Sequence, residues 1–258
     1  MEQETLFGLV LDKSGSMASV TMATVDGVNK LLAEQKGVPG KLYFSETQFD
    51  NSLQTPYVGV DVGLVPAMTP GWGPHSYSPN GGTALFDAVG TTIKGMEKWA
   101  ANKRFKGQVK VAILTDGQEN SSREWHIWNP RVENDAYDLL GLIEWKQKEG
   151  WEFLFLGAGG SAWLERTFGP VVTPEYFHAY TNDVRSNAAV YAGVSTTLTN
   201  SRTLGTSFNS SVLATNVPSN TMTMTSGTPG VPLTFVNKPS KKKGNKDKPD
   251  EGDLVGAK

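Results

Sequence analysis

Apolar residues gather along the chain in short runs that predict the strands of a buried sheet. Three runs are apolar at nearly every position, which is typical of strands covered on both faces, and they span residues 5–11, 109–114 and 151–156. Residues 41–49 alternate between apolar and polar side chains, and residues 57–65 alternate less cleanly. We interpret the first segment as a further strand and the second as an edge strand.

Longer stretches between these runs have apolar residues at helical spacing. They cover residues 20–35, 83–102, 136–148 and 183–203. A shorter helix is predicted around residues 162–168, and a short strand at 177–180. The last long helix is expected to begin at Thr181 or Asn182 as its N-cap. Strands that alternate with helices indicate an α/β fold, with a doubly wound, mostly parallel sheet flanked by helices.

The composition of the chain changes after residue 204. Residues 205–237 are rich in Ser, Thr and Asn and have no clear periodicity, apart from two short candidate strands at 221–225 and 231–236. Residues 238–258 are dominated by lysine and then by acidic residues, with little apolar surface to bury, so we expect a disordered tail. The predicted organisation is one domain over residues 1–204, a C-terminal extension over 205–237 and the charged tail.

Composition excludes several classes of protein. The 258 residues include no cysteine, which excludes disulfides and thiolate metal sites. The first residues, MEQETLFGL, lack the basic start of a signal peptide, and no apolar run approaches the roughly 18 residues of a membrane-spanning helix. We therefore expect a cytoplasmic protein without a membrane partner. The net charge of -2 gives no general attraction to nucleic acid.

Oxygen-bearing side chains follow two of the buried strands. Asp12, Ser14 and Ser16 come directly after the first run, and Asp116 comes shortly after the run at 109–114. Because ligands of parallel sheets bind beyond the carboxyl ends of the strands, these oxygens face one crevice if the two strands are neighbours. Carboxylate and hydroxyl oxygens are hard ligands that suit Mg²⁺, Mn²⁺ or Ca²⁺ and do not suit zinc. The alternative is that they are helix-cap and turn residues.

The segment DKSGSM, which contains Asp12, Ser14 and Ser16, resembles the Asp-x-Ser-x-Ser element of the metal-ion-dependent adhesion site in von Willebrand factor A domains. Thr83 in PNGGTALFDAVG and Asp116 in VKVAILTDGQENSS match the two other elements of that site in sequence and order. The resemblance implies two groups of residues, one that binds the ion directly (Ser14, Ser16 and often Thr83) and one that acts through hydrogen bonds or water (Asp12 and Asp116).

The resemblance covers roughly residues 4–203 and implies a six-stranded sheet with an antiparallel edge strand near residues 57–65. It also implies a protein-binding module, not an enzyme. In such a module the bound cation, Mg²⁺ before Mn²⁺ or Ca²⁺, coordinates an acidic residue of a partner protein. Intracellular relatives often resemble co-factors of AAA+ ATPases, so an AAA+ ATPase is one expected partner, on family analogy alone.

Aromatic residues are frequent in the loop before Thr83 and in the loop after Asp116. Four of them, in the segments before Thr83 and after Asp116, are Trp72, Tyr77, Trp125 and Trp128. Exposed Trp and Tyr often anchor interfaces, so we expect these four to surround the metal and to contact the partner. The alternative is that they pack onto their own loops.

Three charged residues lie beside the candidate ligands. Asp87 shares a helix face with Thr83, and the sequence leaves open whether it orients that side chain or complements the helix N-terminus. Lys13 is expected to point to solvent, and Glu119 is interpreted as a solvated surface residue.

Two other functions can be weighed on the sequence. A metal-dependent phosphohydrolase of the Asp-x-Asp type needs a second carboxylate where Ser14 stands. The 3 histidines, His75, His126 and His178, lie outside the metal motif. Nucleic-acid binding would have to act through the lysine-rich tail, where no aromatic residue is interleaved for stacking. Both are alternatives to protein binding.

Overall fold

The computed structural model describes residues 3–127, 136–159 and 162–213, which belong to one unit of the chain, Met1–Thr221. At the centre of this unit is a six-stranded sheet in the order β3-β2-β1-β6-β7-β8. Every neighbouring pair is parallel except β2 and β3. The strands are β1 (Glu4–Asp12), β2 (Lys41–Phe49), β3 (Leu53–Asp61), β6 (Gln108–Thr115), β7 (Glu152–Ala158) and β8 (Phe177–Tyr180). The predicted fold class is confirmed, with the antiparallel edge strand a few residues earlier than expected.

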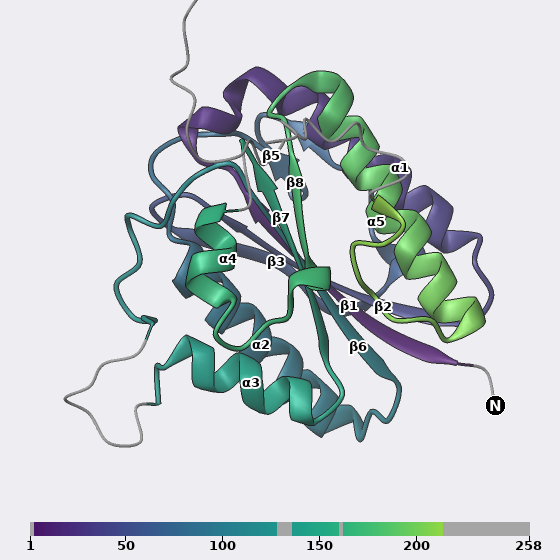
Figure 1. Cartoon of the computed structure of the whole chain (residues 1–258). Coiled ribbons are helices and arrows are strands. Elements are labelled where there is room, and N and C mark those ends of the chain that lie inside the picture. Colours follow the sequence, from purple (N-terminus) through teal and green to yellow (C-terminus); the bar gives the residue numbers. More distant parts are fainter. Residues whose placement is uncertain (1–2, 128–135, 160–161, 214–258) are drawn as a thin grey trace, which may run out of the picture. The chain divides into compact units, whose positions relative to one another are not determined.

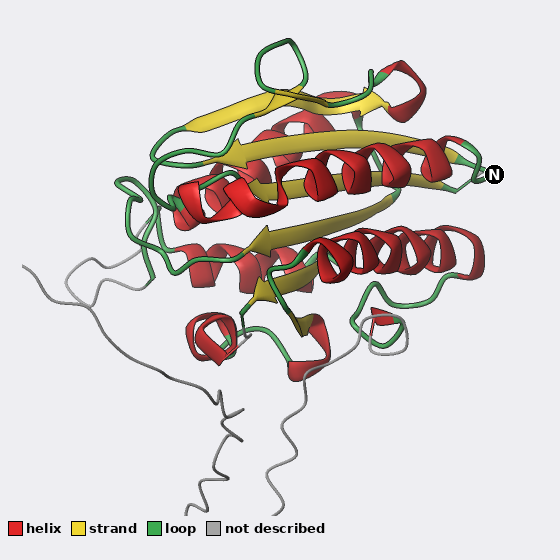
Figure 2. Cartoon of the chain, turned by 90° about the horizontal axis from the view of Figure 1, so that it is seen from above, coloured by secondary structure: helices red, strands yellow, loops and turns green. Residues whose placement is uncertain are grey.

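Helices cover both faces of the sheet (Figure 1, Figure 2). On one face lie α1 (Thr21–Lys36) and α5 (Val184–Leu204), which pack against each other. On the other lie α2 (Leu85–Lys103), α3 (Leu139–Lys148) and α4 (Ala162–Phe168). The sheet therefore has a hydrophobic core on each face. Successive strand residues point to opposite faces, so Phe7 and Leu9 of β1 lie in the core under α1 and α5, and Leu6 and Val10 lie in the core under α2, α3 and α4. No helix of the described residues is long and apolar enough to cross a membrane.

Short elements complete the described unit. They are η1 (Gly15–Val20), η2 (Val62–Leu64), β4 (Thr69–Pro70), β5 (Ser76–Tyr77) and η3 (Pro174–Tyr176). The N-cap of α5 is Asp183, whose carboxylate accepts a hydrogen bond from the backbone N–H of Ser186 at 2.9 Å. The expectation of Thr181 or Asn182 at this position was wrong, because the Asp183 carboxylate takes the capping role. The candidate strands at 221–225 and 231–236 and the charged tail lie outside the described residues.

The two edge strands of the sheet are irregular or short. Pairing between β2 and β3 shifts register on both sides of Glu46. Pro56 lies within β3 and has no N–H group to donate to a ladder. At the opposite edge, β8 has 4 residues. Neither edge therefore presents a long, regular row of backbone donors and acceptors.

The chain continues to pack on the sheet after α5. Phe208 is fully buried, and its ring lies edge-on to Phe7 with the ring centroids 6.0 Å apart. The N–H of Phe208 donates to Glu152 Oε1 at 3.0 Å. Leu213 is also fully buried and lies against Gly193 of α5. The described part of the predicted extension thus joins the hydrophobic core, while the division of the chain at residue 204 stays a prediction.

We expect Phe208→Ala to lower the free energy of unfolding by about 3–5 kcal/mol, because it removes a large buried ring and leaves a cavity. Chemical denaturation followed by circular dichroism measures this change. Leu204→Ala is the control, because Leu204 is exposed and its truncation should cost less than about 0.5 kcal/mol. Equal stability of Phe208→Ala and the wild type would show that the folded unit ends with α5.

Candidate metal centre

Three loops meet at the carboxyl ends of β1 and β6 and bring the candidate ligands together. β1 and β6 are neighbours in the sheet, so Asp12 and Asp116 lie at adjacent strand ends. The third loop carries Thr83 and is tied to the first by a backbone hydrogen bond from Gly15 N to Gly81 O at 3.0 Å. The ends of the parallel strands β1 and β6 therefore bring four of the five predicted ligands to one rim of the sheet. The fifth, Thr83, lies beside them through contacts of its own loop.

Asp12 is fully buried and organises the first loop. Its Oδ1 accepts a hydrogen bond from Ser14 N at 2.7 Å, and its Oδ2 accepts one from Thr115 Oγ1 at 2.6 Å. The carboxylate thus joins the ends of β1 and β6. Burial raises the pKa of Asp12 above its ordinary value; the hydrogen bonds oppose this effect, and the charge of Asp116 adds to it.

Two serine hydroxyls and the Asp116 carboxylate form a cluster of oxygen atoms. Ser14 Oγ and Ser16 Oγ lie 3.0 Å apart. Ser16 Oγ donates to Asp116 Oδ1 at 2.7 Å, and Ser14 Oγ lies 3.5 Å from the same oxygen. Hydroxyl groups have no formal charge, so the carboxylates carry all the charge of this cluster.

Thr83 approaches the cluster from the loop before α2. Its backbone is held by Asn120, since Thr83 N donates to Asn120 Oδ1 at 2.9 Å and Asn120 N donates to Thr83 O at 3.0 Å. A Cβ placed on Gly117, the residue after Asp116, would lie 3.0 Å from Thr83 Oγ1. The Thr83 hydroxyl is therefore in close contact with the loop that follows β6, and a side chain at position 117 would crowd it.

The donor set fits a hard divalent cation. In the part of the chain that the structure describes, no lysine, arginine or histidine forms an ion pair with Asp12 or Asp116. The expectation that Lys13 points to solvent was wrong, because its side chain is largely covered and its Nζ pairs with Asp50 Oδ2 at 3.2 Å. Among the described residues, no group of three or more His, Cys, Asp or Glu side chains is suited to a metal. The candidate centre has two carboxylates, and its other oxygen donors are the hydroxyl groups of serine and threonine.

A fourth loop contributes a residue that we did not predict. Asn182 follows β8, and its Nδ2 donates to Asp116 Oδ2 at 2.6 Å. β8 is parallel to β7, and β7 is parallel to β6, so all three strands end at the same rim of the sheet. The sequence contained a signal for Asn182, because this polar residue follows the predicted strand at 177–180. The rule that ligands bind beyond the carboxyl ends of parallel strands, which identified Asp12 and Asp116, applies to it as well.

Two acidic side chains hold the loop that follows β6. The Asp87 carboxylate accepts hydrogen bonds at 2.8–3.0 Å from the backbone N–H groups of Arg123, Glu124 and Trp125. Glu119, which we interpreted as a solvated residue, accepts hydrogen bonds from Ser122 N at 2.7 Å and from Phe86 N at 3.0 Å. Both carboxylates thus satisfy backbone donors and anchor the loop to the start of α2.

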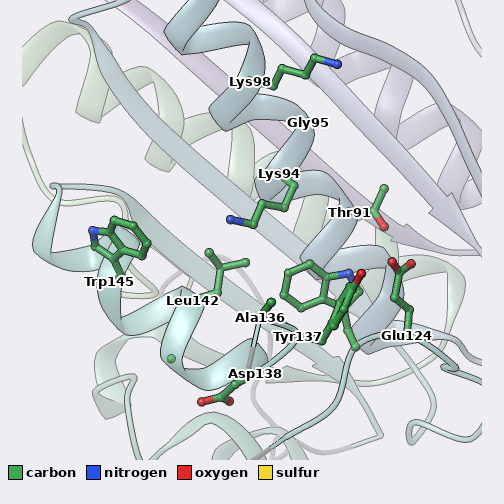
Figure 3. Close-up of a pocket in the computed structure, with 12 residues that line it drawn as sticks. Thr91, Lys94, Gly95, Lys98, Glu124, Ala136, Tyr137, Asp138, Leu142 and Trp145 are labelled. Carbon is green, nitrogen blue, oxygen red and sulfur yellow. The ribbon is translucent and has the colours of Figure 1, made fainter. Parts of the chain in front are cut away.

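The four aromatic residues expected around the metal occupy different environments. Tyr77 is fully buried, and its hydroxyl donates to the Asp12 carbonyl at 2.6 Å. Trp125 is 6% exposed and is one of the residues that line a cavity of about 790 Å³ beside α2 and α3. Figure 3 shows this cavity, with Lys94 of α2 and Leu142 of α3 in its lining. The expectation that Tyr77 and Trp125 stand exposed was wrong, because their rings pack into the fold. Trp72 is 95% exposed, and Trp128 lies outside the described residues.

Solved structures with a similar arrangement of strands and helices include von Willebrand factor A domains. One is a von Willebrand factor type A protein from Catenulispora acidiphila, with 14% sequence identity and a TM-score of 0.52 over 77% of this chain and 43% of that chain. Another is the vWF domain of the type V pili tip protein Mfa5 from Porphyromonas gingivalis, with 10% identity and a TM-score of 0.52 over 77% of this chain and 96% of that chain. The chain has a von Willebrand factor A fold.

A third similar structure is proximal thread matrix protein 1 from the mussel byssus, in a form with a zinc-occupied MIDAS motif. It has 16% identity and a TM-score of 0.50 over 77% of this chain and 46% of that chain. The present chain thus spans less than half the length of the mussel and Catenulispora proteins. At these identities the likeness concerns the fold alone. No protein-family model and no curated protein matches the sequence.

Trp72 lies at the tip of a loop whose stem is fixed to the von Willebrand factor A fold. The strands β4 and β5 pair within this stem. On α1, the Asn29 side chain donates to Met68 O at 3.0 Å and accepts from Met68 N at 2.7 Å. The residues on either side of Trp72 are Gly71 and Gly73, with φ angles of 87° and 151°. The stem is therefore anchored to the fold, and the Trp72 indole at its tip is exposed to solvent.

A buried polar pair supports the same stem from β2. His75 Nε2 lies 2.8 Å from Glu46 Oε2, and His75 Nδ1 lies 2.8 Å from the Pro66 carbonyl oxygen. Gln48 Nε2 donates to the other Glu46 oxygen at 2.7 Å. Burial opposes the charged form of His75, but its hydrogen bond to Glu46 and the Glu46 charge outweigh this effect and raise the pKa of His75.

We expect the stability contributed by His75 to fall as pH rises above about 6.5. A histidine whose pKa is raised by folding contributes stability that is fully present below the unfolded value of about 6.5 and is lost as pH passes the folded value. Denaturation at about pH 5.5 and pH 8.5 should show a larger loss in the wild type than in His75→Gln. Groups that titrate in both proteins contribute equally, so comparing the two changes in the free energy of unfolding isolates the contribution of His75. An identical pH dependence of the wild type and His75→Gln would contradict the role of the His75–Glu46 pair.

Proposed function

We propose that the chain is a protein-binding module that depends on a divalent metal ion. The observation that carries this proposal is the placement of Asp12 and Asp116 at adjacent strand ends, with the hydroxyl groups of Ser14 and Ser16 beside Asp116. The described residues supply no cationic side chain paired with either carboxylate. A cation at this position would offset two negative charges that otherwise disfavour each other.

The proposed ligands have different roles. Ser14, Ser16 and Thr83 supply hydroxyl oxygens, while Asp12 and Asp116 orient the loops through hydrogen bonds and contribute negative charge. When bound, the ion supplies a positive charge with a coordination position for an outside carboxylate, because hydroxyl ligands do not neutralise it. Mg²⁺ is the proposed ion, with Mn²⁺ and Ca²⁺ as alternatives. Zinc occupies the MIDAS motif of the mussel protein, so zinc also belongs in the test.

The proposed partner is a protein that presents an exposed Asp or Glu side chain. Trp72 is the exposed aromatic residue that we propose binds beside this carboxylate, because its stem is joined to the metal loops by the hydrogen bond from Tyr77 to Asp12. An exposed tryptophan is a common anchor of interfaces. An AAA+ ATPase as partner and a cytoplasmic location are finer proposals that rest on the family resemblance.

We propose no catalytic step at this centre. His75 is buried with both ring nitrogens in hydrogen bonds, and His178 is buried on β8, so neither is exposed to a substrate. The phosphohydrolase alternative therefore gains no support from these two histidines. The lysine-rich tail, on which the nucleic-acid alternative depends, lies outside the described residues.

Metal binding should be measured directly by thermal unfolding with Mg²⁺, Mn²⁺, Ca²⁺ or Zn²⁺ added to protein first stripped with EDTA. Because an ion that binds only the folded state stabilises it, the wild type should gain about 2.7 kcal/mol at an ion concentration 100 times Kd. The double variant Ser14→Ala with Ser16→Ala should lose this gain. Ser207→Ala, at an exposed serine, is the matched control. If no ion stabilised the wild type, the metal function would be rejected.

Partner capture from a cell extract should depend on both the ion and Trp72. We expect EDTA to abolish capture and Trp72→Ala to weaken it by about 2 kcal/mol or more, roughly 30-fold, at unchanged melting temperature. Trp145→Ala removes a tryptophan that is 57% exposed on α3 and should leave capture unchanged. Trp125→Ala should lower the melting temperature instead, because its ring is buried. Capture that persists in EDTA would contradict a carboxylate–metal contact.

A further inference from the structure

Asn182 joins the candidate metal centre from the connection between β8 and α5. Its side-chain nitrogen donates to Asp116 Oδ2 at 2.6 Å. An ionised carboxylate only accepts hydrogen bonds, so the amide NH₂ group must face Asp116 and the amide oxygen must face away. That oxygen accepts a hydrogen bond from Asn187 Nδ2 at 3.3 Å, which agrees with this orientation.

The first turn of α5 holds Asn182 in place. Asn187 is fully buried, so its amide is a fixed support for Asn182. The residue after Asn182 is the helix cap Asp183, which accepts hydrogen bonds from Ser186 N at 2.9 Å and from the hydroxyl of Thr181. The residues on both sides of Asn182 are therefore engaged with each other, and its side chain is preorganised toward Asp116.

This contact separates the roles of the two Asp116 oxygens. Oδ2 is engaged by Asn182, whereas Oδ1 faces Ser16 Oγ at 2.7 Å and Ser14 Oγ at 3.5 Å. One oxygen of the carboxylate is thus directed at the hydroxyl cluster. Ca²⁺ takes about six to eight ligands and accepts both oxygens of one carboxylate, whereas Mg²⁺ requires near-octahedral geometry and takes single oxygens.

We propose that Asn182 is a positioning residue that favours Mg²⁺ over Ca²⁺. It engages Asp116 Oδ2, so this carboxylate, which otherwise acts on the ion through hydrogen bonds or water, presents a single oxygen and cannot make the two-oxygen contact that Ca²⁺ accepts. This inference rests on the proposed metal function and adds a determinant of ion choice. Asn182 acts through Asp116, so its removal should change the relation between the two ions. A residue that merely stabilised the loop would affect both ions equally.

The test is isothermal titration of Mg²⁺ and of Ca²⁺ into the wild type and into Asn182→Ala. Asn182→Ser keeps a hydrogen-bond donor and serves as a second variant, and Asn102→Ala, at an exposed position on α2, is the control. Removing a side chain that orients a metal ligand typically costs 10–100-fold in affinity, so we expect the Mg²⁺ affinity of Asn182→Ala to fall about tenfold. The Ca²⁺ affinity should fall much less, with Asn182→Ser between the wild type and Asn182→Ala. Circular dichroism of the metal-free proteins confirms that each variant is folded.

The outcomes separate this inference from the function on which it rests. A wild type that binds neither ion would reject the metal function and this inference with it. A wild type that binds ions, with both Asn182 variants losing Mg²⁺ and Ca²⁺ affinity by equal factors or losing none, would overturn the role of Asn182 alone. A shift of the Mg²⁺-to-Ca²⁺ affinity ratio toward Ca²⁺, absent in Asn102→Ala, is the expected result.

Discussion

Two carboxylates at adjacent strand ends, Asp12 and Asp116, set the main physical constraint on this structure. The parallel pairing of β1 with β6 brings them together, and no cationic side chain of the described residues pairs with either. Asp12 is fully buried, so the interaction between the charges is less screened than in water. Hydrogen-bond donors of Ser14, Ser16, Thr115 and Asn182 surround the pair without cancelling its charge, which leaves the rim of the sheet suited to a positive ligand.

The loops around this pair are shaped by hydrogen bonds from side chains to the backbone more than by apolar packing. Asn120 forms hydrogen bonds with both the N–H and the carbonyl group of Thr83. The Asp87 carboxylate accepts hydrogen bonds from three consecutive N–H groups of the loop after β6. Short polar side chains can satisfy the backbone where no regular ladder exists. This explains why the segment DGQENSS combines Asn, Ser and acidic residues. Irregular segments can thus be held firmly although few of their residues enter the core.

The fold and the meeting of Asp12 and Asp116 could be predicted because both follow from the pattern of the strands and the topology of the sheet, whereas Thr83 was assigned to the site through the family resemblance alone. Continuous apolar runs identify β1, β6 and β7, and the carboxyl-end rule then locates Asp12 and Asp116. The burial of Tyr77 and Trp125 could not be predicted in the same way, because irregular segments have no periodicity to show which side faces the core. Trp125 packs so closely on Gly90 of α2 that a Cβ there would lie 2.2 Å from the indole, a contact between residues 35 positions apart in sequence. Asn182 was missed although the carboxyl-end rule applies to it.

The irregular edges of the sheet affect how this protein meets other chains. A long, flat edge strand can pair with a second molecule and begin aggregation, and some domains capture extended peptides in the same way. Here the register of β3 shifts beside Glu46, Pro56 interrupts its row of donors, and β8 has only 4 residues. Growth of the sheet across molecules is therefore disfavoured at both margins. Recognition by strand addition is disfavoured for the same reason, so a partner of this protein is expected to contact side chains and loops and not the backbone of an edge strand.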